Sequence, residues 1–273
     1  MSLCLCGYVD VKAPFPRDIT DALAAVGSRL GIFGAGLSWY EQASSTNDLA
    51  ASQALEGAPE GVVVAAGSQT SGRGRFGRSW ASPSGAGVYA SAILRPSPHI
   101  VSLVTIAAGV AVAEGIEAAT GLDPTLKWPN DVHVGARKLA GILAEAGGAG
   151  LGSPYVVLGF GINVTSAPYP PDVAARATSI ESELRRPCDR GRVLAECLVA
   201  LADRYRALQQ DQTSVVTSAW RARAAGYLGR EVEWDADGTT RRGVAEDIDP
   251  RGALLVRTDR DIVPVISGEV RWV

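Results

Sequence analysis

The stretch Gly67-Ser-Gln-Thr-Ser-Gly-Arg-Gly-Arg-Phe-Gly-Arg-Ser-Trp-Ala-Ser82 follows the apolar run 62–66, which is typical of a buried strand that ends in a loop. Its centre, residues 72–78, contains three glycines and three arginines. Glycine lets a ligand approach the main-chain N–H groups closely, and arginine presents a planar fork that matches phosphate or carboxylate oxygens. No Asp or Glu occurs between Glu60 and Glu114. We therefore interpret this segment, the arginine loop, as a site for a polyanion.

Other interpretations of the arginine loop are weaker. Short basic clusters are often solvated surface features, and acidic residues from distant segments can pair with the arginines. Gly/Arg segments that bind RNA occur in disordered low-complexity tracts, whereas this one lies between apolar segments. Gly67 and Gly72 have the glycine spacing of a P-loop, but Arg73-Gly74 replaces the required Lys-Ser/Thr. Phosphate binding here is therefore expected to be of another type.

The composition excludes several classes of protein. The chain of 273 residues is 47% hydrophobic, has a net charge of −3 and a pI near 5.5, so it has no overall attraction to nucleic acid or anionic membranes. Its four cysteines show neither metal-ligand spacing nor the density of a secreted disulfide scaffold, although Cys4-x-Cys6 can contribute to a metal site. The start has no signal-peptide pattern, and we expect a cytoplasmic protein. The apolar stretch 103–122 contains Glu114 and Glu117, which favours a core helix over a membrane span.

Hydrophobic periodicity predicts an alternation of strands and helices. Strands are expected at 37–42, 62–66, 87–94, 126–128, 138–145 and 154–163, and helices at 17–30, from 45 onward, and at 100–120, 190–210 and 213–225. Residues 1–16 are expected to form a loose tail, and residues 165–190 a proline-rich loop. A single helix before residue 37 is too little for a helix-turn-helix DNA reader.

The pattern changes at residue 226. Five short alternating segments separated by turn signals lie within fewer than fifty residues, which predicts a small β-barrel. We accordingly divide the chain into a tail and helix (1–36), a catalytic domain (37–225) and a small C-terminal domain (226–273).

Several polar residues stand where they can serve either structure or binding. Ser45 and Asp48 have capping-box spacing, so Ser45, Thr46 and Asn47 can cap a helix, bind a small polar ligand, or do both. Lys138 opens an almost wholly apolar strand, where its ammonium either reaches solvent or meets an anion. Glycine inside a strand, as at Gly159 and Gly161, often marks the close approach of a ligand.

Five motifs in order resemble the signature of biotin protein ligases. They are Ser45-Thr-Asn47, Gln69 with Gly72-Arg-Gly-Arg-Phe-Gly-Arg78, Lys127-Trp-Pro-Asn-Asp131, Arg137-Lys-Leu-Ala-Gly-Ile-Leu143 and Leu158-Gly-Phe-Gly-Ile-Asn163. The resemblance runs from about residue 38 to the C-terminus. It implies an α+β fold, with a class II synthetase-like catalytic domain followed by a small SH3-like β-barrel.

The resemblance implies a ligase that forms biotinoyl-5′-AMP from biotin and MgATP and then transfers biotin to a lysine of a biotin carboxyl carrier protein. Lys138, Arg73 and Arg78 are implied as catalytic, and Asp131 is expected near the carrier lysine. The residues implied for biotin binding are Ser45, Thr46, Asn47, Gln69, Gly72, Arg73, Lys138, Gly141, Gly159 and Gly161. Those implied for ATP binding are Arg73, Arg75, Arg78, Trp80, Lys127, Asn130, Lys138 and Asn163.

The remaining implications concern partners. Mg²⁺ is expected to arrive on the ATP phosphates, because no cluster of protein ligands is evident. We expect no DNA or membrane partner, a monomer or weak homodimer, and no N-terminal repressor domain of the kind some relatives carry.

A lipoate or octanoate ligase or transferase of the related fold is the alternative enzyme. A regulatory module that binds phosphate or nucleic acid is the alternative without catalysis, and it predicts strongly salt-dependent affinity.

Overall fold

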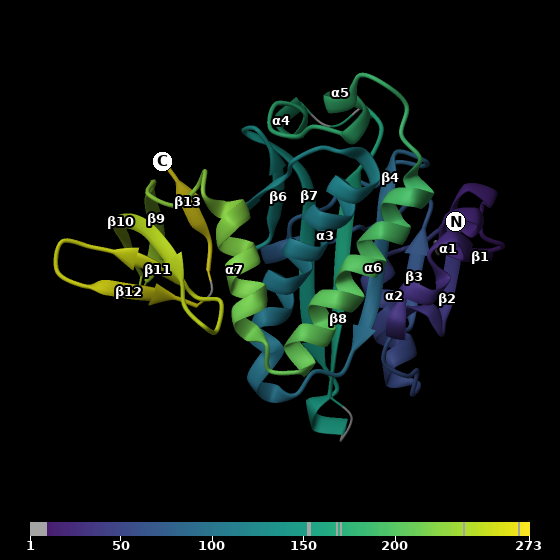
Figure 1. Ribbon diagram of the computed structural model, residues 1–273, viewed down its shortest axis with the longest axis horizontal. Coiled ribbons are helices and arrows are strands. Elements are labelled where there is room, and N and C mark those ends of the chain that lie inside the picture. Colours follow the sequence, from purple (N-terminus) through teal and green to yellow (C-terminus); the bar gives the residue numbers. More distant parts are fainter. Residues whose placement is uncertain (1–9, 152–153, 168, 170, 237, 267) are drawn as a thin grey trace, which may run out of the picture.

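The computed structural model describes residues 10–151, 154–167, 169, 171–236, 238–266 and 268–273. Its centre is an eight-stranded sheet of order β1-β2-β3-β4-β8-β7-β6-β5, in which only the pair β2 and β3 is parallel (Figure 1). The strands are β1 (Val11–Ala13), β2 (Leu37–Gln42), β3 (Val63–Ala66), β4 (Gly87–Leu94), β5 (Thr125–Lys127), β6 (Asp131–Val134), β7 (Arg137–Gly147) and β8 (Tyr155–Asn163).

Both faces of the sheet centre are covered, which explains why its strands are continuous apolar runs rather than alternating ones. Every residue of β3, β4 and β8 is buried. Helices α3 (Val104–Thr120) and α6 (Arg190–Gln209) lie over the face that carries Val63 and Ala65, and α1 (Arg17–Ala25) packs beside α6 (Figure 1). Helix α2 (Thr46–Leu55) covers the opposite face, where Val64 lies.

The apolar stretch that approaches membrane length is a core helix. Residues Pro98–Thr120, comprising the 3-10 turn η4 (Pro98–Leu103) and α3, are long and apolar enough to cross a membrane, but most of this segment is buried inside the fold. A Cβ added at Gly115 would lie 2.4 Å from the Cα of Cys197, so glycine is what lets α3 approach α6.

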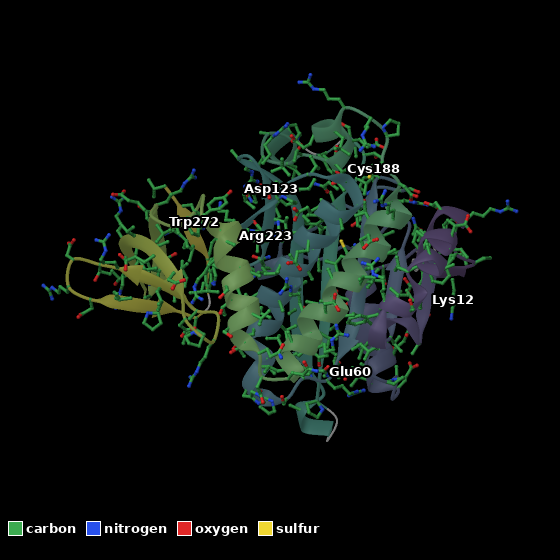
Figure 2. All side chains as sticks on the ribbon, viewed as in Figure 1. Lys12, Glu60, Asp123, Cys188, Arg223 and Trp272 are labelled. Atoms are coloured by element: carbon green, nitrogen blue, oxygen red, sulfur yellow. The ribbon has the colours of Figure 1, made fainter. Side chains whose placement is uncertain are left out.

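Helix α7 (Thr213–Ala224) follows α6 and packs on α3. Arg223 on α7 pairs with Glu117 at the end of α3, and its Nη1 lies 3.7 Å from Asp123 Oδ1 just beyond (Figure 2). These pairs hold α7 between the central sheet and the C-terminal part of the chain (Figure 1).

The C-terminal part is a five-stranded antiparallel sheet of order β12-β11-β10-β9-β13. Its strands are β9 (Glu231–Ala236), β10 (Thr239–Ile248), β11 (Leu254–Arg257), β12 (Ile262–Val265) and β13 (Val270–Trp272). Trp128 Nε1 donates to the Gly252 carbonyl oxygen at 2.9 Å, and Arg221 Nε donates to Asp247 at 2.5 Å. The fold class predicted from the sequence is confirmed.

Three local predictions need correction. Residues 11–13 do not belong to a loose tail, because they form β1 and pair with β2. The helix predicted at 17–30 ends at Ala25 and continues as the 3-10 turns η1 (Gly27–Arg29) and η2 (Gly31–Gly34). The segment 165–190 contains α4 (Pro171–Ala174) and α5 (Ile180–Leu184), the latter capped by Ser179 and anchored by the buried Ile180. Cys4 and Cys6 lie outside the described residues.

Candidate active site

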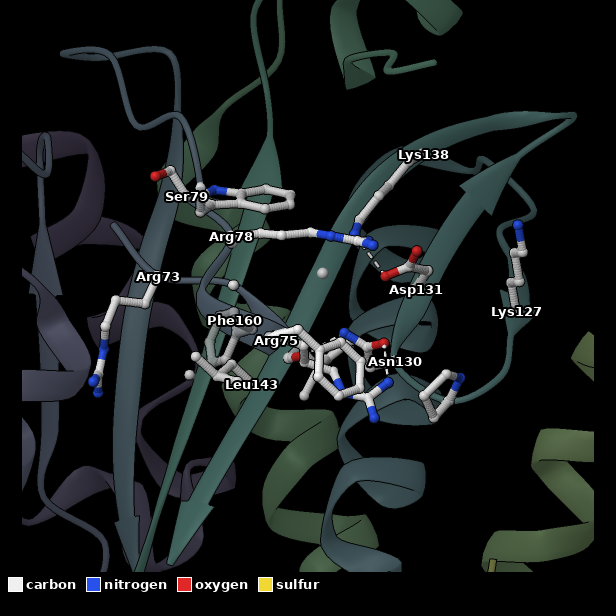
Figure 3. Close-up of a pocket in the computed structure, with 18 of the residues that line it drawn as sticks. Arg73, Arg75, Arg78, Ser79, Lys127, Asn130, Asp131, Lys138, Leu143 and Phe160 are labelled. Carbon is white, nitrogen blue, oxygen red and sulfur yellow. Dashed lines mark hydrogen bonds and ion pairs between the residues drawn. The ribbon is translucent and has the colours of Figure 1, made fainter. Parts of the chain in front are cut away.

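A cavity of about 370 Å³ opens on the face of the sheet that also carries α2 (Figure 3). Its walls come from the start of α2, the arginine loop, strands β6, β7 and β8, and strand β13 of the C-terminal sheet. The predicted site residues that line it are Ser45, Thr46, Asn47, Gln69, Arg73, Arg75, Arg78, Trp80, Lys127, Asn130, Asp131, Lys138, Gly141, Gly159 and Gly161.

The central sheet forms the floor of the cavity, and strand register places four of the predicted site residues in one row across it. Lys127 pairs with Asp131, Asp131 with Gly141, and Gly141 with Gly161. Directly opposed residues on neighbouring strands project to the same face of a sheet. The row therefore combines charged groups at one end with glycines at the other, where the floor is open.

The indole of Trp80 lies over this glycine end. A Cβ added at Gly161 would lie 2.4 Å from Trp80 Nε1, and one at Gly141 would lie 3.0 Å from Trp80 Cζ3. At Gly159 it would meet Asn47 Oδ1 at 2.1 Å. Trp80 Nε1 is itself buried and has no hydrogen-bond partner among the described residues. Because these three residues are glycines, the side chains of Trp80 and Asn47 can lie directly against the sheet. The Trp80 indole N–H has no hydrogen-bond acceptor there among the described residues.

A polar network forms the wall beside the glycine end. Gln69 Oε1 accepts hydrogen bonds from the Thr46 backbone N–H at 2.8 Å and from Thr46 Oγ1 at 3.1 Å. Ser91 Oγ donates to Asn47 Oδ1 at 2.6 Å. Ser45 Oγ accepts from the Asp48 N–H at 3.4 Å, so the predicted helix cap is confirmed. This wall offers donors and acceptors to a neutral polar ligand.

Two of the three arginines of the arginine loop, Arg73 and Arg78, form ion pairs with acids that are distant in sequence. Arg73 Nη2 lies 2.5 Å from Glu145 Oε2 and 2.9 Å from Asp48 Oδ1, and its side chain is directed away from Lys138 (Figure 3). Arg78 pairs with Glu269, the residue directly before β13. The distant acidic partners that the sequence left open are therefore present.

Arg75 links the arginine loop to the sheet and to the C-terminal part of the chain. Its Nη1 donates to Asn130 Oδ1 and its Nη2 to the Gly268 carbonyl oxygen, each at 3.3 Å. Burial lowers the pKa of Arg75, and Asp131 and Glu269 partly offset this effect. The adjacent Phe76 adopts a left-handed φ of 56° and is exposed. Arg75 thus connects the arginine loop to Asn130 and to the segment that precedes β13.

Two lysines face the charged end of the floor. Lys138 Nζ forms an ion pair with Asp131 Oδ1 at 2.6 Å and lies 5.4 Å from the centroid of the Trp80 ring (Figure 3). Burial lowers the pKa of Lys127; Asp131 opposes this shift, and Lys138 adds to it. Together with Arg75 and Arg78 they make this end of the cavity cationic, which suits phosphate groups.

Two predicted site residues are not among those that line the cavity. Asn163 is buried, and its Nδ2 donates to the Thr178 carbonyl oxygen at 2.9 Å. Gly72 lies within the arginine loop, at a point where an added Cβ would lie 2.5 Å from the Trp80 carbonyl oxygen. Its lack of a side chain allows the loop to fold back on itself.

Sequence reasoning missed several lining residues, some within the motifs and some outside them. They include Phe160, Arg176 and the segment 269–272 of the C-terminal sheet. Arg176 is brought to the cavity because its carbonyl oxygen accepts from the Lys138 N–H at 2.8 Å. An arginine in the proline-rich segment was the only available signal. Among the described residues, no group of three or more His, Cys, Asp or Glu side chains could hold a metal ion.

Comparison with known families first defines the class of protein. The sequence model of the Biotin/lipoate A/B protein ligase family matches residues 39–163, and that of the biotin protein ligase C terminal domain matches residues 227–271. The catalytic fold and the small terminal sheet are therefore those of this class of ligases.

Individual relatives show which family within this class of ligases the chain belongs to. The chain is 33% identical over 268 residues to the bifunctional ligase/repressor BirA of Bacillus subtilis, covering 97% of this chain and 82% of the relative. It is 35% identical over 253 residues to the biotin--[acetyl-CoA-carboxylase] ligase of Mycobacterium tuberculosis, covering 88% and 91%. The biotin protein ligase from Aquifex aeolicus, solved in complex with biotin and ATP, superimposes with a TM-score of 0.75 at 27% identity, covering 87% and 98%. The chain belongs to the biotin protein ligase family.

Proposed function

We propose that the cavity forms biotinoyl-5′-AMP from biotin and MgATP and then transfers the biotinoyl group to a lysine of a biotin carboxyl carrier protein. In the first step a biotin carboxylate oxygen attacks the α-phosphorus, and pyrophosphate leaves. In the second step the carrier amine attacks the acyl carbon, AMP leaves, and the nitrogen loses a proton. The observation that carries the proposal is a cavity with cations at one end and a neutral polar wall at the other.

The cationic end supports the first step. Two anions must meet there, so positive charge has to be present where negative charge accumulates. Lys138 Nζ lies 5.4 Å from the centroid of the Trp80 ring, and we assign Lys138 to the carboxylate and the α-phosphate. Arg75, Arg78, Lys127 and Asn130 are assigned to the nucleotide and the departing pyrophosphate. Because Lys138 and Arg78 are paired with Asp131 and Glu269, binding of substrate would exchange these carboxylates for phosphates.

The polar wall supports binding of the ureido ring, which carries both donors and an acceptor. Thr46 and Gln69 present such groups, with Ser45 and Asn47 beside them. The glycine floor would accommodate the flat bicycle only if Trp80 moves off Gly161. Arg73 is assigned to ordering of the arginine loop over the ligand, and Asp131 to the incoming carrier lysine.

The remaining parts of the proposal concern setting and partners. Mg²⁺ would arrive with ATP, since Asp131 and Glu269, which line the cavity, already hold cationic side chains. We assign the chemistry to residues 37–225, assisted by residues 226–273, and a cytoplasmic location as a monomer or weak homodimer. A DNA or membrane partner is not part of the proposal.

The test is biotin-dependent release of pyrophosphate from ATP by the purified protein, with lipoate and octanoate as parallel substrates and no carrier present. Release with biotin alone supports adenylation, and biotin transfer to added carrier domain then tests the second step. Release only with lipoate or octanoate, or no release with any acid, would contradict the proposal.

A further inference from the structure

A buried histidine lies behind the charged end of the cavity, outside the residues assigned to substrate. His133 on β6 is 6% exposed, and its Nδ1 lies 2.8 Å from the Tyr227 hydroxyl. Its Nε2 is buried and has no hydrogen-bond partner among the described residues. The nearest acid is Asp131, whose Oδ2 lies 4.0 Å from that nitrogen. A buried polar atom without a partner is rare and points to a second arrangement in which it has one.

Strand geometry explains why His133 and Asp131 face one another. They are two residues apart on β6, so both project to the same face. His133 pairs across the strands with Lys138, which forms the ion pair with Asp131 through the other carboxylate oxygen, Oδ1. Asp131 therefore has one oxygen paired with a cation of the site, and its other oxygen lies 4.0 Å from His133 Nε2, which is unpartnered among the described residues.

The ring is neutral, and its tautomer depends on whether the Tyr227 hydroxyl donates to Nδ1 or accepts from it. Burial lowers the pKa of His133 to about 4; Asp131 and the Ala136 backbone oppose this shift, whereas Lys127 and Lys138 add to it. Burial also raises the pKa of Tyr227, so the phenol keeps its proton. When the phenol donates to Nδ1, the ring proton must be on Nε2, facing Asp131.

We propose that His133 is a positioning residue that becomes the hydrogen-bond donor to Asp131 when an anionic substrate draws Lys138 away. This inference rests on the proposed function, because it concerns the same lysine. A substrate anion that binds the Lys138 ammonium competes with Asp131 for the position and the charge of that group. The Nε2–H group can close the gap of 4.0 Å by a small movement and satisfy the released carboxylate.

The energetic argument concerns the partly buried carboxylate. The Asp131 side chain is 26% exposed, so the loss of its ion pair with Lys138 is not fully compensated by water. A replacement donor lowers the cost of freeing Lys138 for catalysis. Tyr227, which lies between α7 and β9 and packs edge-on against Trp272 at 5.2 Å between ring centroids, thereby connects the C-terminal sheet to this exchange.

Substitution of His133 by Asn or by Gln tests the Nε2–H donor separately from the rest of the imidazole ring. The amide of Gln reaches the position of Nε2 and can donate to Asp131, whereas the shorter Asn reaches only the position of Nδ1 and keeps the contact with Tyr227. We would measure pyrophosphate release at saturating biotin and varied ATP for His133→Asn and His133→Gln. His99→Asn is the matched control, because His99 is exposed and pairs with Asp211.

The inference predicts that His133→Asn lowers kcat about tenfold, as expected for loss of a hydrogen bond to a charged group, and that His133→Gln recovers most of this rate. When each substitution is combined with Asp131→Asn, the difference in kcat between the His133→Asn and His133→Gln variants should vanish. Equal rates for the Asn and Gln variants, or a difference that persists without the carboxylate, would overturn the inference. Absence of biotin-dependent release by the wild-type protein would instead contradict the proposed function itself.

A second variant covers the case in which substitutions at His133 prevent folding. Tyr227→Phe retains the ring contacts but removes the hydroxyl, so the proton is no longer directed to Nε2. The inference predicts a loss of about threefold in kcat with the melting temperature nearly maintained. A wild-type rate in this variant would count against the role of the tautomer.

Discussion

The unusual environment of His133 predicts a specific loss of stability in acid. Burial lowers the pKa of this side chain from 6.5 to about 4 in the folded protein. Between these two values the unfolded chain binds a proton that the folded protein does not. The free energy of unfolding should therefore rise with pH across this window, and the contribution is lost progressively as the pH falls from 6.5 toward 4.

The magnitude follows from the difference of the two pKa values. At pH 4.5 the linkage relation gives a destabilisation of about 2.5 kcal/mol relative to pH 7 from this single group. That is a large fraction of the 5–15 kcal/mol by which typical domains are stable. Carboxylates that titrate in the same pH range add their own effects on the free energy of unfolding. The contribution of His133 alone must therefore be obtained by comparison with a variant that lacks this histidine.

The assay is urea unfolding at pH 7 and pH 4.5 for the wild-type protein, His133→Gln and His99→Asn. The difference in unfolding free energy between the two pH values should be about 2.5 kcal/mol smaller in His133→Gln, because glutamine does not titrate. His99→Asn should behave as the wild type, since His99 is exposed. An equal pH difference in all three proteins would refute the argument, because it would mean that His133 titrates normally in the folded state.

Three further predictions concern the proposed activity. Lys138→Ala should lower biotin-dependent pyrophosphate release about a hundredfold or more with little change in melting temperature, whereas the neighbouring control Arg137→Ala should not; near-wild-type release would remove Lys138 from the mechanism. Arg73→Gly, which removes the contacts with Glu145 and Asp48, should let biotinoyl-AMP escape and biotinylate bystander lysines on an added protein; tighter retention would contradict the assignment. Gly161→Ala should weaken biotin binding in calorimetry about tenfold or more, since its Cβ would occupy the part of the floor on which the bicycle is proposed to lie, while Gly150→Ala, with open space around it, should bind normally; equal affinities would show that the floor need not be open.

Much of the site could be predicted from local sequence. The arginine loop follows a buried strand as the apolar run at 62–66 indicated, and Ser45 caps α2 as its spacing to Asp48 indicated. These features depend on neighbouring residues, whose contacts follow from the period of the strand or the helix. The ordered motifs were specific enough to indicate the biotin protein ligase family, which the comparisons confirmed.

The corrections concern residues whose partners are far away in the chain. Residues 11–13 carry no strong strand pattern, and they become a strand only because β2 offers a free edge. Ile180 appeared to belong to a proline-rich loop, yet it is fully buried and anchors α5. Propensity is a weak guide at such positions, because packing against a distant element determines the outcome.

The sequence by itself determined the class of fold, the family and most of the residues that line the cavity, because each motif is short and its geometry is local. Only the tertiary structure decided which charges meet: Arg73 with Glu145, Arg78 with Glu269, and Lys138 with Asp131. It also placed His133 behind Asp131 with an unused nitrogen. Strand register and the docking of the C-terminal sheet set these distances, and both arise from contacts between residues that lie far apart in the chain.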